Sequence, residues 1–403
     1  MNSYPEQLLQ KTNKYLFKYA GKTRKVALRL LFFNLKHLLG LSEFADIVFS
    51  ALNKTPRDRL KIAIHLGGGI GDVIIGCLFV KRFAQKLDCN HQLDVFFDQS
   101  FGVISPLLEN QKYITNFRNV KEFSQYKYDF VLALDGQFPI VKRYAQKKVE
   151  RFSPFLSDYA KKLRRFADCD FPLAFSVYHT FNHQHWLLIN GLTRITGMDV
   201  YGILGIRADD TLDIPLDGES ATLSKLELAG TGYITMSRSG DVRNKNANST
   251  RYWGVEKYGE LAALLKARYP DLKIVQIGGA NSLSIENTDA DFAGKITFAE
   301  TLVVLKNATL HIDSESGYVH LRHFLSGGCS AALFGPTAVE TRGYPENINI
   351  RSSVCNCRFC EWINGDKWQV CCPRSQSENS TCMQSISPEL VAEKIDGYLN
   401  GKL

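Results

Sequence analysis

The stretch Lys61-Ile-Ala-Ile-His-Leu66, followed by Gly67-Gly-Gly-Ile-Gly-Asp72, decides the fold of this chain. Its first half is a short apolar run that ends in glycines, which is typical of a buried strand. The apolar segment 73–83 that follows predicts a helix. A strand, a glycine turn and a helix in this order indicate the start of a parallel α/β sheet.

Strands and helices alternate in two separate parts of the chain. The first part has predicted strands at 61–66, 93–97 and 128–134. The second has predicted strands at 232–237, 272–277, 309–312 and 330–334, and predicted helices at 255–268, 298–307 and 319–325. Strands separated by helices predict parallel sheets with right-handed crossovers. We therefore expect an α/β fold in which two Rossmann-like, doubly wound domains face a central cleft.

The boundary between the two parts is expected near residues 205–228. This gives a basic helical extension over 1–58 and a first Rossmann-like domain over 59–220. A second Rossmann-like domain is expected over 228–386, and a last helix over 387–403.

The positive charge of the chain lies in two segments. The 403 residues have a formal net charge of +8. Residues 1–60 contain 11 Lys or Arg against 4 Asp or Glu, and residues 141–165 contain 9 against 2. Such segments favour polyanionic partners, such as a phosphorylated lipid, a membrane surface or nucleic acid. The alternative is a solvated basic face that has no partner.

The apolar runs are too short for a membrane-spanning helix, which needs about 20 apolar residues. The first residues also lack the apolar centre and cleavage site of a signal peptide. We therefore expect a cytoplasmic protein.

The glycine turn at 67–72 contains a candidate catalytic residue. Its spacing fails the dinucleotide fingerprint, because Asp72 stands at the third glycine position counted from Gly67, which argues against a dinucleotide oxidoreductase. A carboxylate there would repel a pyrophosphate. We interpret Asp72 as a group that takes up a proton or holds a sugar hydroxyl. The alternative is a helix-start carboxylate that only stabilises the helix dipole.

Two later loops contain groups that suit a diphosphate. The loop from Ser237 to Trp253 follows a predicted strand and contains Arg251 among other basic residues. The segment Asp313-Ser-Glu-Ser-Gly-Tyr-Val-His320 lies between a strand and a helix. Backbone N–H groups at such a turn can hold phosphate oxygens without a metal. A lone histidine such as His320 is more often structural than catalytic.

Together these motifs resemble glycosyltransferase family 9, the ADP-heptose heptosyltransferases. Segment 313–321 and the following Ala332-Leu-Phe-Gly-Pro-Thr337 are similar to the C-terminal signature of that family. Further similar motifs are Gly68-Gly-Ile-Gly-Asp72, Arg251-Tyr-Trp253, Gly278-Gly279 and Cys382-Met383-x-x-Ile386. The resemblance covers about 61–140 and 230–400, in the family's order.

The resemblance implies a GT-B fold, with the acceptor on domain 59–220 and the nucleotide sugar on domain 228–386. It also implies that Asp72 is the general base and that Arg251 neutralises the diphosphate. The implied donor-binding residues are Ser237, Arg251, Gly278, Asp313, Glu315, Ser316, Gly317, Tyr318 and His320.

The chain departs from the family pattern at two places. Arg251 replaces a lysine, which keeps the charge but adds a forked donor. The family's acid, five residues before the histidine, corresponds to Glu315, whereas Asp313 lies two residues earlier. Which carboxylate meets the sugar therefore stays open.

The residues agree with transfer chemistry. Displacement of a nucleoside diphosphate from an anomeric carbon needs a base on the acceptor hydroxyl and positive charge or N–H donors on the leaving group. Asp72 on one domain, with Arg251 and the Gly317 turn on the other, suits a single displacement with inversion. An Asp-x-Asp motif is lacking where a diphosphate would lie, so we expect no metal in catalysis.

Six of the ten cysteines lie in the segment 355–382. Clustered thiols in a cytosolic chain bind metal more often than they form disulfides. We expect a structural zinc or iron ion, and its predicted ligands are Cys357, Cys360, Cys372 and Cys382, with Cys371 interchangeable with Cys372. The alternative is a set of thiols that bind no metal.

The predicted function is heptose transfer from ADP-heptose to a lipopolysaccharide or lipo-oligosaccharide core. The expected acceptor is phosphorylated lipid A–core at the inner membrane, without nucleic acid. One alternative within the family is a protein O-heptosyltransferase that modifies an autotransporter and binds iron through cysteines. An alternative of another class is a basic membrane- or nucleic-acid-binding module, for which Tyr144, Phe152 and Phe155 lie among the basic residues.

Overall fold

The structure of the chain is a computed structural model. It describes residues 58–97, 104, 105, 108, 111–135, 138–167, 186–238, 249–355, 360 and 371–401, with the side chain of residue 135 left out. The predicted basic extension over 1–58 lies outside this part, apart from its last residue. The described residues belong to one compact unit. Within them, every helix is too short or too polar to cross a bilayer.

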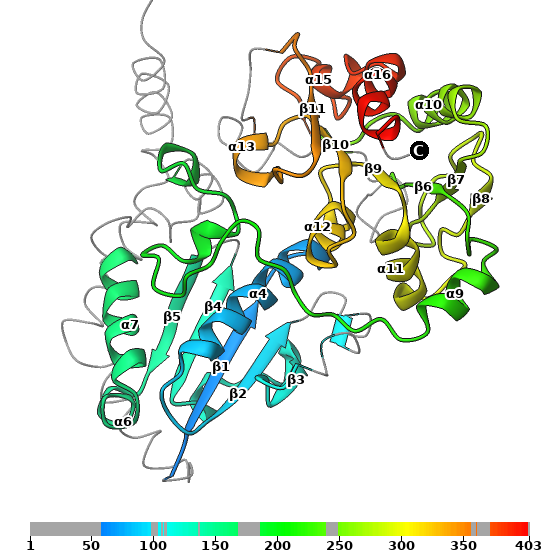
Figure 1. The fold of residues 1–403 in the computed structure, drawn as a ribbon. Helices are drawn as coiled ribbons and strands as arrows, with labels where there is room; N and C mark the ends of the chain where they lie inside the picture. Colours follow the sequence, from blue (N-terminus) through cyan, green and yellow to red (C-terminus); the bar gives the residue numbers. More distant parts are fainter. Residues whose placement is uncertain are drawn as a thin grey trace, which may run out of the picture. The chain divides into compact units, whose positions relative to one another are not determined.

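The first sheet has five strands in the order β3-β2-β1-β4-β5 (Figure 1). Their bounds are β1 Leu60–Leu66, β2 His91–Phe97, β3 Asn116–Asn119, β4 Phe130–Asp135 and β5 Phe138–Tyr144. β1, β2 and β4 are the three predicted strands and are parallel, as predicted. β3, which was not predicted, is parallel to β2. β5, which was not predicted as a strand, is antiparallel to β4. Only two residues separate β4 from β5, and a parallel return needs a crossover of about a dozen residues or more.

The helices of this first part are α4 Ile70–Lys86, α6 Gln146–Phe152 and α7 Pro154–Arg165. Short 3-10 turns span η2 Val120–Glu122, η3 Gln125–Lys127 and η6 Thr196–Met198. α4 begins three residues before the predicted helix because the glycine turn leads directly into it. The basic segment 141–165 falls on β5, α6 and α7.

The second sheet is parallel throughout, in the order β11-β10-β9-β6-β7-β8. Its strands are β6 Tyr233–Met236, β7 Lys273–Gln276, β8 Ala290–Asp291, β9 Leu310–Ser314, β10 Ser330–Phe334 and β11 Ile348–Arg351. The helices are α9 Glu219–Lys225, α10 Val255–Arg268, α11 Phe298–Asn307, α12 Gly317–Phe324, α13 Val339–Arg342, α15 Thr381–Gln384 and α16 Pro388–Leu399.

Helices cover both faces of this second sheet, so its central strands are buried throughout. Ile234 and Met236 of β6 pack in one apolar cluster with residues of α10 and α16. Tyr233, one position away on the same strand, packs in the other cluster with residues of α11 and α12. This alternation follows from the two-residue period of a strand. Figure 1 shows the two helix pairs on opposite sides of β6 and β9.

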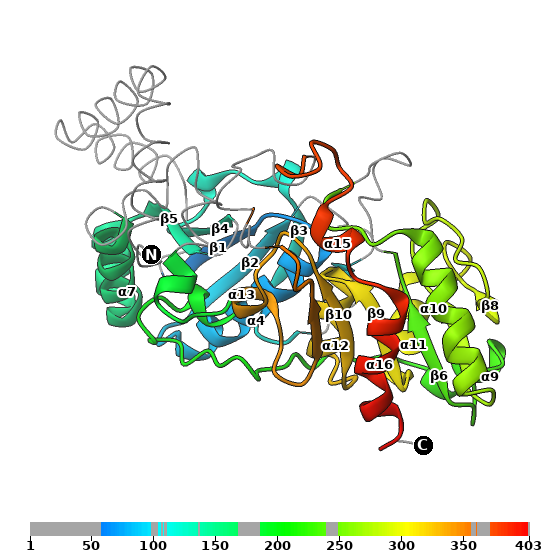
Figure 2. The same cartoon turned by 90° about the horizontal axis from the view of Figure 1, so that it is seen from above.

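The N-terminal end of α4 packs against α12 (Figures 1 and 2). A β-carbon placed on Gly71 would lie 2.9 Å from His320 Cδ2 and 3.2 Å from Gly317 Cα. Contacts this short exclude a side chain at Gly71. The glycine therefore permits the close approach of the first strand–turn–helix unit to the helix that follows β9.

Arg322 on α12 joins three backbone segments inside the second sheet's helical layer. Its side chain is 1% exposed, and it donates to the carbonyl oxygens of Leu305, Ala308 (2.7 Å) and Cys329 (3.0 Å). Leu305 and Ala308 lie at the C-terminal end of α11, where carbonyl groups lack helical partners. Burial lowers the pKa of Arg322 to about 10, so the group remains charged at neutral pH.

Arg322→Met should therefore destabilise the fold strongly. The substitution keeps the apolar stem but removes the guanidinium donors from three buried carbonyl groups, and a buried group that loses its donor costs about 1–3 kcal/mol. We expect the free energy of unfolding in urea to fall by about 3 kcal/mol or more. Lys225→Met is the control, since it removes an exposed ion pair with Glu300, worth at most about 1 kcal/mol. Equal stability of the two variants would contradict the structural role of Arg322.

Candidate active site

Three predicted site segments lie at the carboxyl edge of the second sheet. β6 runs into Ser237, β7 is followed by Gly278, and β9 by Glu315. β9, β6 and β7 are adjacent and parallel, so their carboxyl ends meet at one edge. Ligands of open α/β sheets bind at this edge. The parallel arrangement of these strands therefore brings Ser237, Gly278 and Glu315, three of the predicted donor-binding residues, to one edge of the sheet.

Asp72 lies in the first turn of α4, where both oxygens of its carboxylate have partners. Oδ2 accepts a hydrogen bond from the backbone N–H of Gly69 at 2.9 Å, and Oδ1 accepts one from Arg194. The side chain is 32% exposed, so it remains accessible from the site. Burial opposes its ionisation, but the Arg194 guanidinium and the Gly69 N–H outweigh burial and hold the pKa of Asp72 below its usual range.

The glycine turn gives Asp72 its place. Gly68 has φ +97°, a left-handed conformation that glycine adopts without strain, and a β-carbon there would overlap the Asp72 carboxylate. The hydrogen bond from Gly69 gives Asp72 the helix-start role considered as an alternative from the sequence. Its other oxygen, Oδ1, accepts from Arg194 and takes no part in the helix-start hydrogen bond.

Arg194 is one of two arginines of the candidate site that the sequence analysis missed. It lies between Asp72 of the first part and His320 of the second, with Nη1 3.5 Å from His320 Nε2. Its backbone N–H donates to the carbonyl of Thr341 at 2.8 Å. The surrounding sequence, Gly191-Leu-Thr-Arg-Ile-Thr196, has no motif that would mark it. Only the three-dimensional contacts identify this arginine.

Glu315 is buried directly after β9 and lies among cations. Its Oε1 accepts from Arg342 Nη1 at 3.3 Å, and its Oε2 lies 3.7 Å from Arg251 Nη1. His320 Nε2 is 3.3 Å from Oε1. Burial disfavours the charged form, but the Arg342 guanidinium, His320 and Arg251 hold the pKa of Glu315 well below its usual range. Glu315 is therefore a carboxylate at neutral pH. Its partner Arg342, like Arg194, belongs to no motif of the sequence analysis.

His320 serves as a neutral connector in this arrangement. Burial is the main cause that lowers its pKa, so the ring is uncharged at neutral pH. Its Nδ1 lies 2.7 Å from the hydroxyl of Tyr344. The pKa of Tyr344 is raised by burial, so its hydroxyl keeps its proton. His320 Nε2 faces both Glu315 Oε1 at 3.3 Å and Arg194 Nη1 at 3.5 Å.

The structure thus connects four of the predicted residues through Arg194. The chain of contacts runs from Asp72 to Arg194, His320, Glu315 and finally Arg251. Three guanidinium groups, including Arg342, face two carboxylates. Among these five charged groups positive charge is in excess, which suits an anionic ligand.

The other predicted donor-binding residues lie nearby in the fold, with contacts of their own. Asp313 accepts from Ser316 Oγ at 2.6 Å and lies 3.7 Å from His311 Nε2. The ring of Tyr318 packs edge-on against His311. The backbone N–H of Ser237 donates to Ile312 at 3.1 Å, and Gly278 accepts from Gly294 at 3.0 Å. Gly317 begins α12. Asp313 thus contacts Ser316 and His311, whereas Glu315 is the carboxylate that contacts Arg251 and Arg342.

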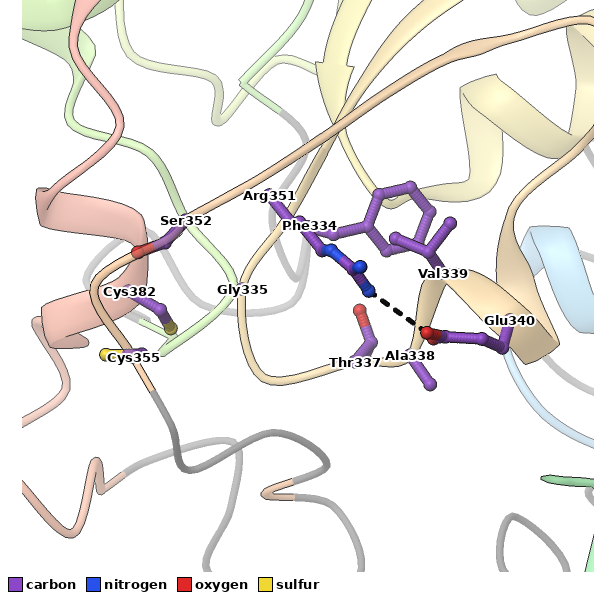
Figure 3. A pocket seen from close by; sticks show the side chains of 10 residues that line it. All are labelled: Phe334, Gly335, Thr337, Ala338, Val339, Glu340, Arg351, Ser352, Cys355 and Cys382. Carbon is purple, nitrogen blue, oxygen red and sulfur yellow. Dashed lines mark hydrogen bonds and ion pairs between the residues drawn. The ribbon is translucent and has the colours of Figure 1, made fainter. Parts of the chain in front are cut away.

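The predicted metal ligands are covered only in part. Cys357 lies outside the described residues, whereas Cys360, Cys372 and Cys382 are described and buried. Cys355 and Cys382 line one pocket together with Gly335 and Thr337. Figure 3 shows both thiols at the end of this pocket away from the Arg351–Glu340 ion pair.

The thiol of Cys372 has a lowered pKa. Burial raises the pKa of its thiol, but hydrogen bonds from backbone groups of Ser375 and Thr381 outweigh burial and lower the pKa to about 7. A thiolate is the form that binds metal. Over the ranges given above, however, three or more His, Cys, Asp or Glu side chains do not gather into a metal-binding group.

Comparison with known proteins gives matches in structure only. Neither a protein-family profile nor a curated protein sequence matches the chain. The ADP-heptose LPS heptosyltransferase II of E. coli is similar at TM-score 0.51 and 14% identity, covering 85% of this chain and 99% of that one. A family 9 glycosyltransferase from Veillonella parvula is similar at TM-score 0.53 and 15% identity, covering 86% and 99%.

A third similar structure is the iron-containing dodecameric glycosyltransferase TibC of enterotoxigenic E. coli, at TM-score 0.55 and 16% identity. It covers 86% of this chain and 77% of TibC. TibC has also been solved in complex with ADP-D-β-D-heptose. At these identities the likeness concerns the architecture. The predicted fold class is confirmed: this chain has the two-domain, Rossmann-like GT-B fold seen in glycosyltransferase family 9.

Proposed function

We propose that this protein is an inverting glycosyltransferase that moves heptose from ADP-heptose to a hydroxyl of a lipopolysaccharide core acceptor. One observation carries the proposal. Asp72, at the helix start of the first sheet's α4, is connected through Arg194 and His320 to Glu315 and Arg251 at the carboxyl edge of the second sheet. A base and a cationic phosphate site therefore lie within one contact chain.

The donor diphosphate would bind on the side of Arg251. The Arg251 side chain is 30% exposed, so its guanidinium can turn from Glu315 to a ligand phosphate. The N-terminus of α12 adds backbone N–H donors and a positive dipole end. Both stabilise the negative charge that develops on the leaving ADP.

Asp72 would act on the acceptor. Its carboxylate takes the proton of the acceptor hydroxyl while that oxygen forms the bond to the anomeric carbon. The bond from this carbon to the diphosphate breaks, and ADP leaves with the electron pair from the opposite face. A carboxylate with a lowered pKa is a weak base, which suits late proton transfer, because the hydroxyl becomes acidic only as the new bond forms.

The choice of acceptor rests on charge. α6 and α7 contain Lys147, Arg151, Lys161 and Arg164 on exposed or partly exposed positions. A phosphorylated lipid A–core saccharide at the inner membrane is complementary to such a face. The E. coli heptosyltransferase II of similar fold acts in lipopolysaccharide synthesis by its name.

A second candidate is transfer of heptose to a protein, the alternative within the resembled family that binds iron through cysteines. The similar TibC structure is described as iron-containing, and Cys355, Cys372 and Cys382 are buried in this chain. The alternative therefore differs from the first in its acceptor and shares the proposed donor and base.

A transfer assay with ADP-heptose decides between the two acceptors. One arm contains a heptose-deficient lipid A–core, and the other contains an autotransporter passenger protein rich in serine. We expect mass spectrometry to show one added heptose on the lipid A–core acceptor. Addition to the passenger protein alone would support the second candidate. If ADP but not NAD raises the melting temperature of the protein, and neither acceptor gains a heptose, the proposal of heptosyl transfer is contradicted.

Asp72→Asn should remove transfer but keep donor binding. The amide retains an acceptor for the Gly69 N–H but cannot take a proton, and general-base catalysis contributes about 10²–10⁴-fold. We expect kcat to fall by at least about 100-fold, with the Kd for ADP, measured by calorimetry, changed less than threefold, ~0.7 kcal/mol. A parallel loss of ADP binding would place Asp72 in the donor site or in folding instead.

We further propose that the cysteine segment binds one structural zinc or iron ion. The residues that would hold it are Cys357, Cys360, Cys372 and Cys382, and the low pKa of Cys372 supports thiolate ligation. When bound, such an ion would link the ends of the segment and contribute to folding.

Elemental analysis of the purified protein should therefore find about one zinc or iron per chain. Cys382→Ser should lower this metal content severalfold, and Cys77→Ser, a buried thiol of α4, is the matched control that should keep it. If wild-type protein from cells grown with added zinc and iron contains neither metal, the proposed site is refuted.

A further inference from the structure

We infer that Arg194 is a positioning residue of the transfer reaction, which orients the Asp72 carboxylate and keeps it ionised. This inference rests on the proposed function, in which Asp72 is the base. Arg194 belongs to none of the sequence motifs. It is assigned from its place between the two parts of the site.

The backbone and the side chain of Arg194 are both held in place. The backbone N–H donates to the carbonyl of Thr341, just before Arg342, at 2.8 Å. The side chain is 6% exposed, and its terminal nitrogens contact Asp72 and His320. An arginine fixed at its backbone and buried along its stem has little freedom to leave Asp72. The forked guanidinium therefore sets the direction of the carboxylate.

The groups that face Arg194 leave Asp72 as its charged partner. His320 is neutral, so the ring provides no negative charge to Arg194. Glu315 is held by Arg342 and Arg251. Within the described residues, Asp72 is the carboxylate in contact with Arg194. Removal of Arg194 would leave Asp72 with the hydrogen bond from Gly69 and the charge of Arg342.

Arg194 affects proton transfer with a definite sign. It favours the carboxylate, so it lowers the pH at which Asp72 becomes protonated. When Asp72 takes the proton of the acceptor, the ion pair ends and the charge of Arg194 loses its partner. Without Arg194 the pKa of Asp72 rises, and the acid limb of the pH dependence of kcat moves to higher pH. A residue that only stabilised the fold would leave that limb unchanged.

The same helix offers a matched control. Arg82, near the other end of α4, pairs with Asp210 at 3.0 Å through Nε. This ion pair, like that of Arg194 with Asp72, connects α4 to the part of the chain after residue 186. Arg82 also holds the pKa of Asp210 below its usual range. Arg82→Met therefore removes an arginine–aspartate pair from α4 without touching the site.

The experiment measures the Asp72 pKa directly and independently of activity. Full-length protein with ¹³C-labelled aspartate carboxyl groups is titrated by NMR, and the Asp72 signal is identified by its loss in Asp72→Asn. We expect Arg194→Met to raise the Asp72 pKa by about 1–2 units, and Arg82→Met to leave it unchanged. Arg194→Lys keeps the charge, so the Asp72 pKa should stay low while the carboxylate loses its forked partner.

The activity measurements then link this pKa to the reaction. In Arg194→Met the acid limb of kcat should move to higher pH by the same amount, and kcat at neutral pH should fall about 100-fold from misplacement. The KM for ADP-heptose should change less, because Arg251 and α12 hold the donor. Arg194→Lys should recover part of kcat and the position of the limb.

The outcomes separate this inference from the proposed function. An active wild-type protein with the same Asp72 pKa and acid limb in Arg194→Met overturns the role of Arg194 alone. A wild-type protein that transfers no heptose overturns the proposed function, whatever the titration shows. If Arg194→Met fails to fold, an Arg194→Lys variant whose kcat and pH profile equal those of the wild type overturns the orienting role.

Discussion

Two helix N-termini, those of α4 and α12, approach each other closely enough that Gly71 and Gly317 nearly touch. Each end has unpaired N–H groups and a partial positive charge, so their approach requires negative charge nearby. Asp72 in the first turn of α4 and Glu315 just before α12 supply it. The same contact that joins the two sheets thus brings a candidate base and a candidate phosphate site together.

Buried carboxylates are unfavourable unless cations and hydrogen bonds surround them. Here Arg194 forms an ion pair with Asp72, while Arg342 and Arg251 form ion pairs with Glu315. Neutral His320 connects the two groups without adding charge. The arrangement holds more guanidinium groups than carboxylates, so a diphosphate could enter without leaving the arginines unbalanced. This accounts for the dense charge at a place where a stable core alone would have apolar residues.

Residues whose surroundings are local in the sequence were predictable. The glycine turn at 67–69 positions Asp72 three residues later, and the turn at 315–317 follows its strand directly. Within the second sheet, the parallel strands β9, β6 and β7 then bring the turns that follow them to one edge. The sequence analysis missed β5, where a two-residue connection imposes an antiparallel hairpin on an otherwise parallel sheet. The predicted cysteine ligands lie partly outside the described residues.

The sequence by itself determined the alternation of strands and helices, the two sheets and the turns that carry Asp72 and Glu315, because each depends on residues a few positions apart. Only the tertiary structure decided which arginines form ion pairs with those carboxylates. Arg194 and Asp72 are 122 positions apart, and Arg342 and Glu315 are 27 apart. Side chains at such distances meet only after both sheets have packed through α4 and α12, and no local pattern of residue types specifies that meeting.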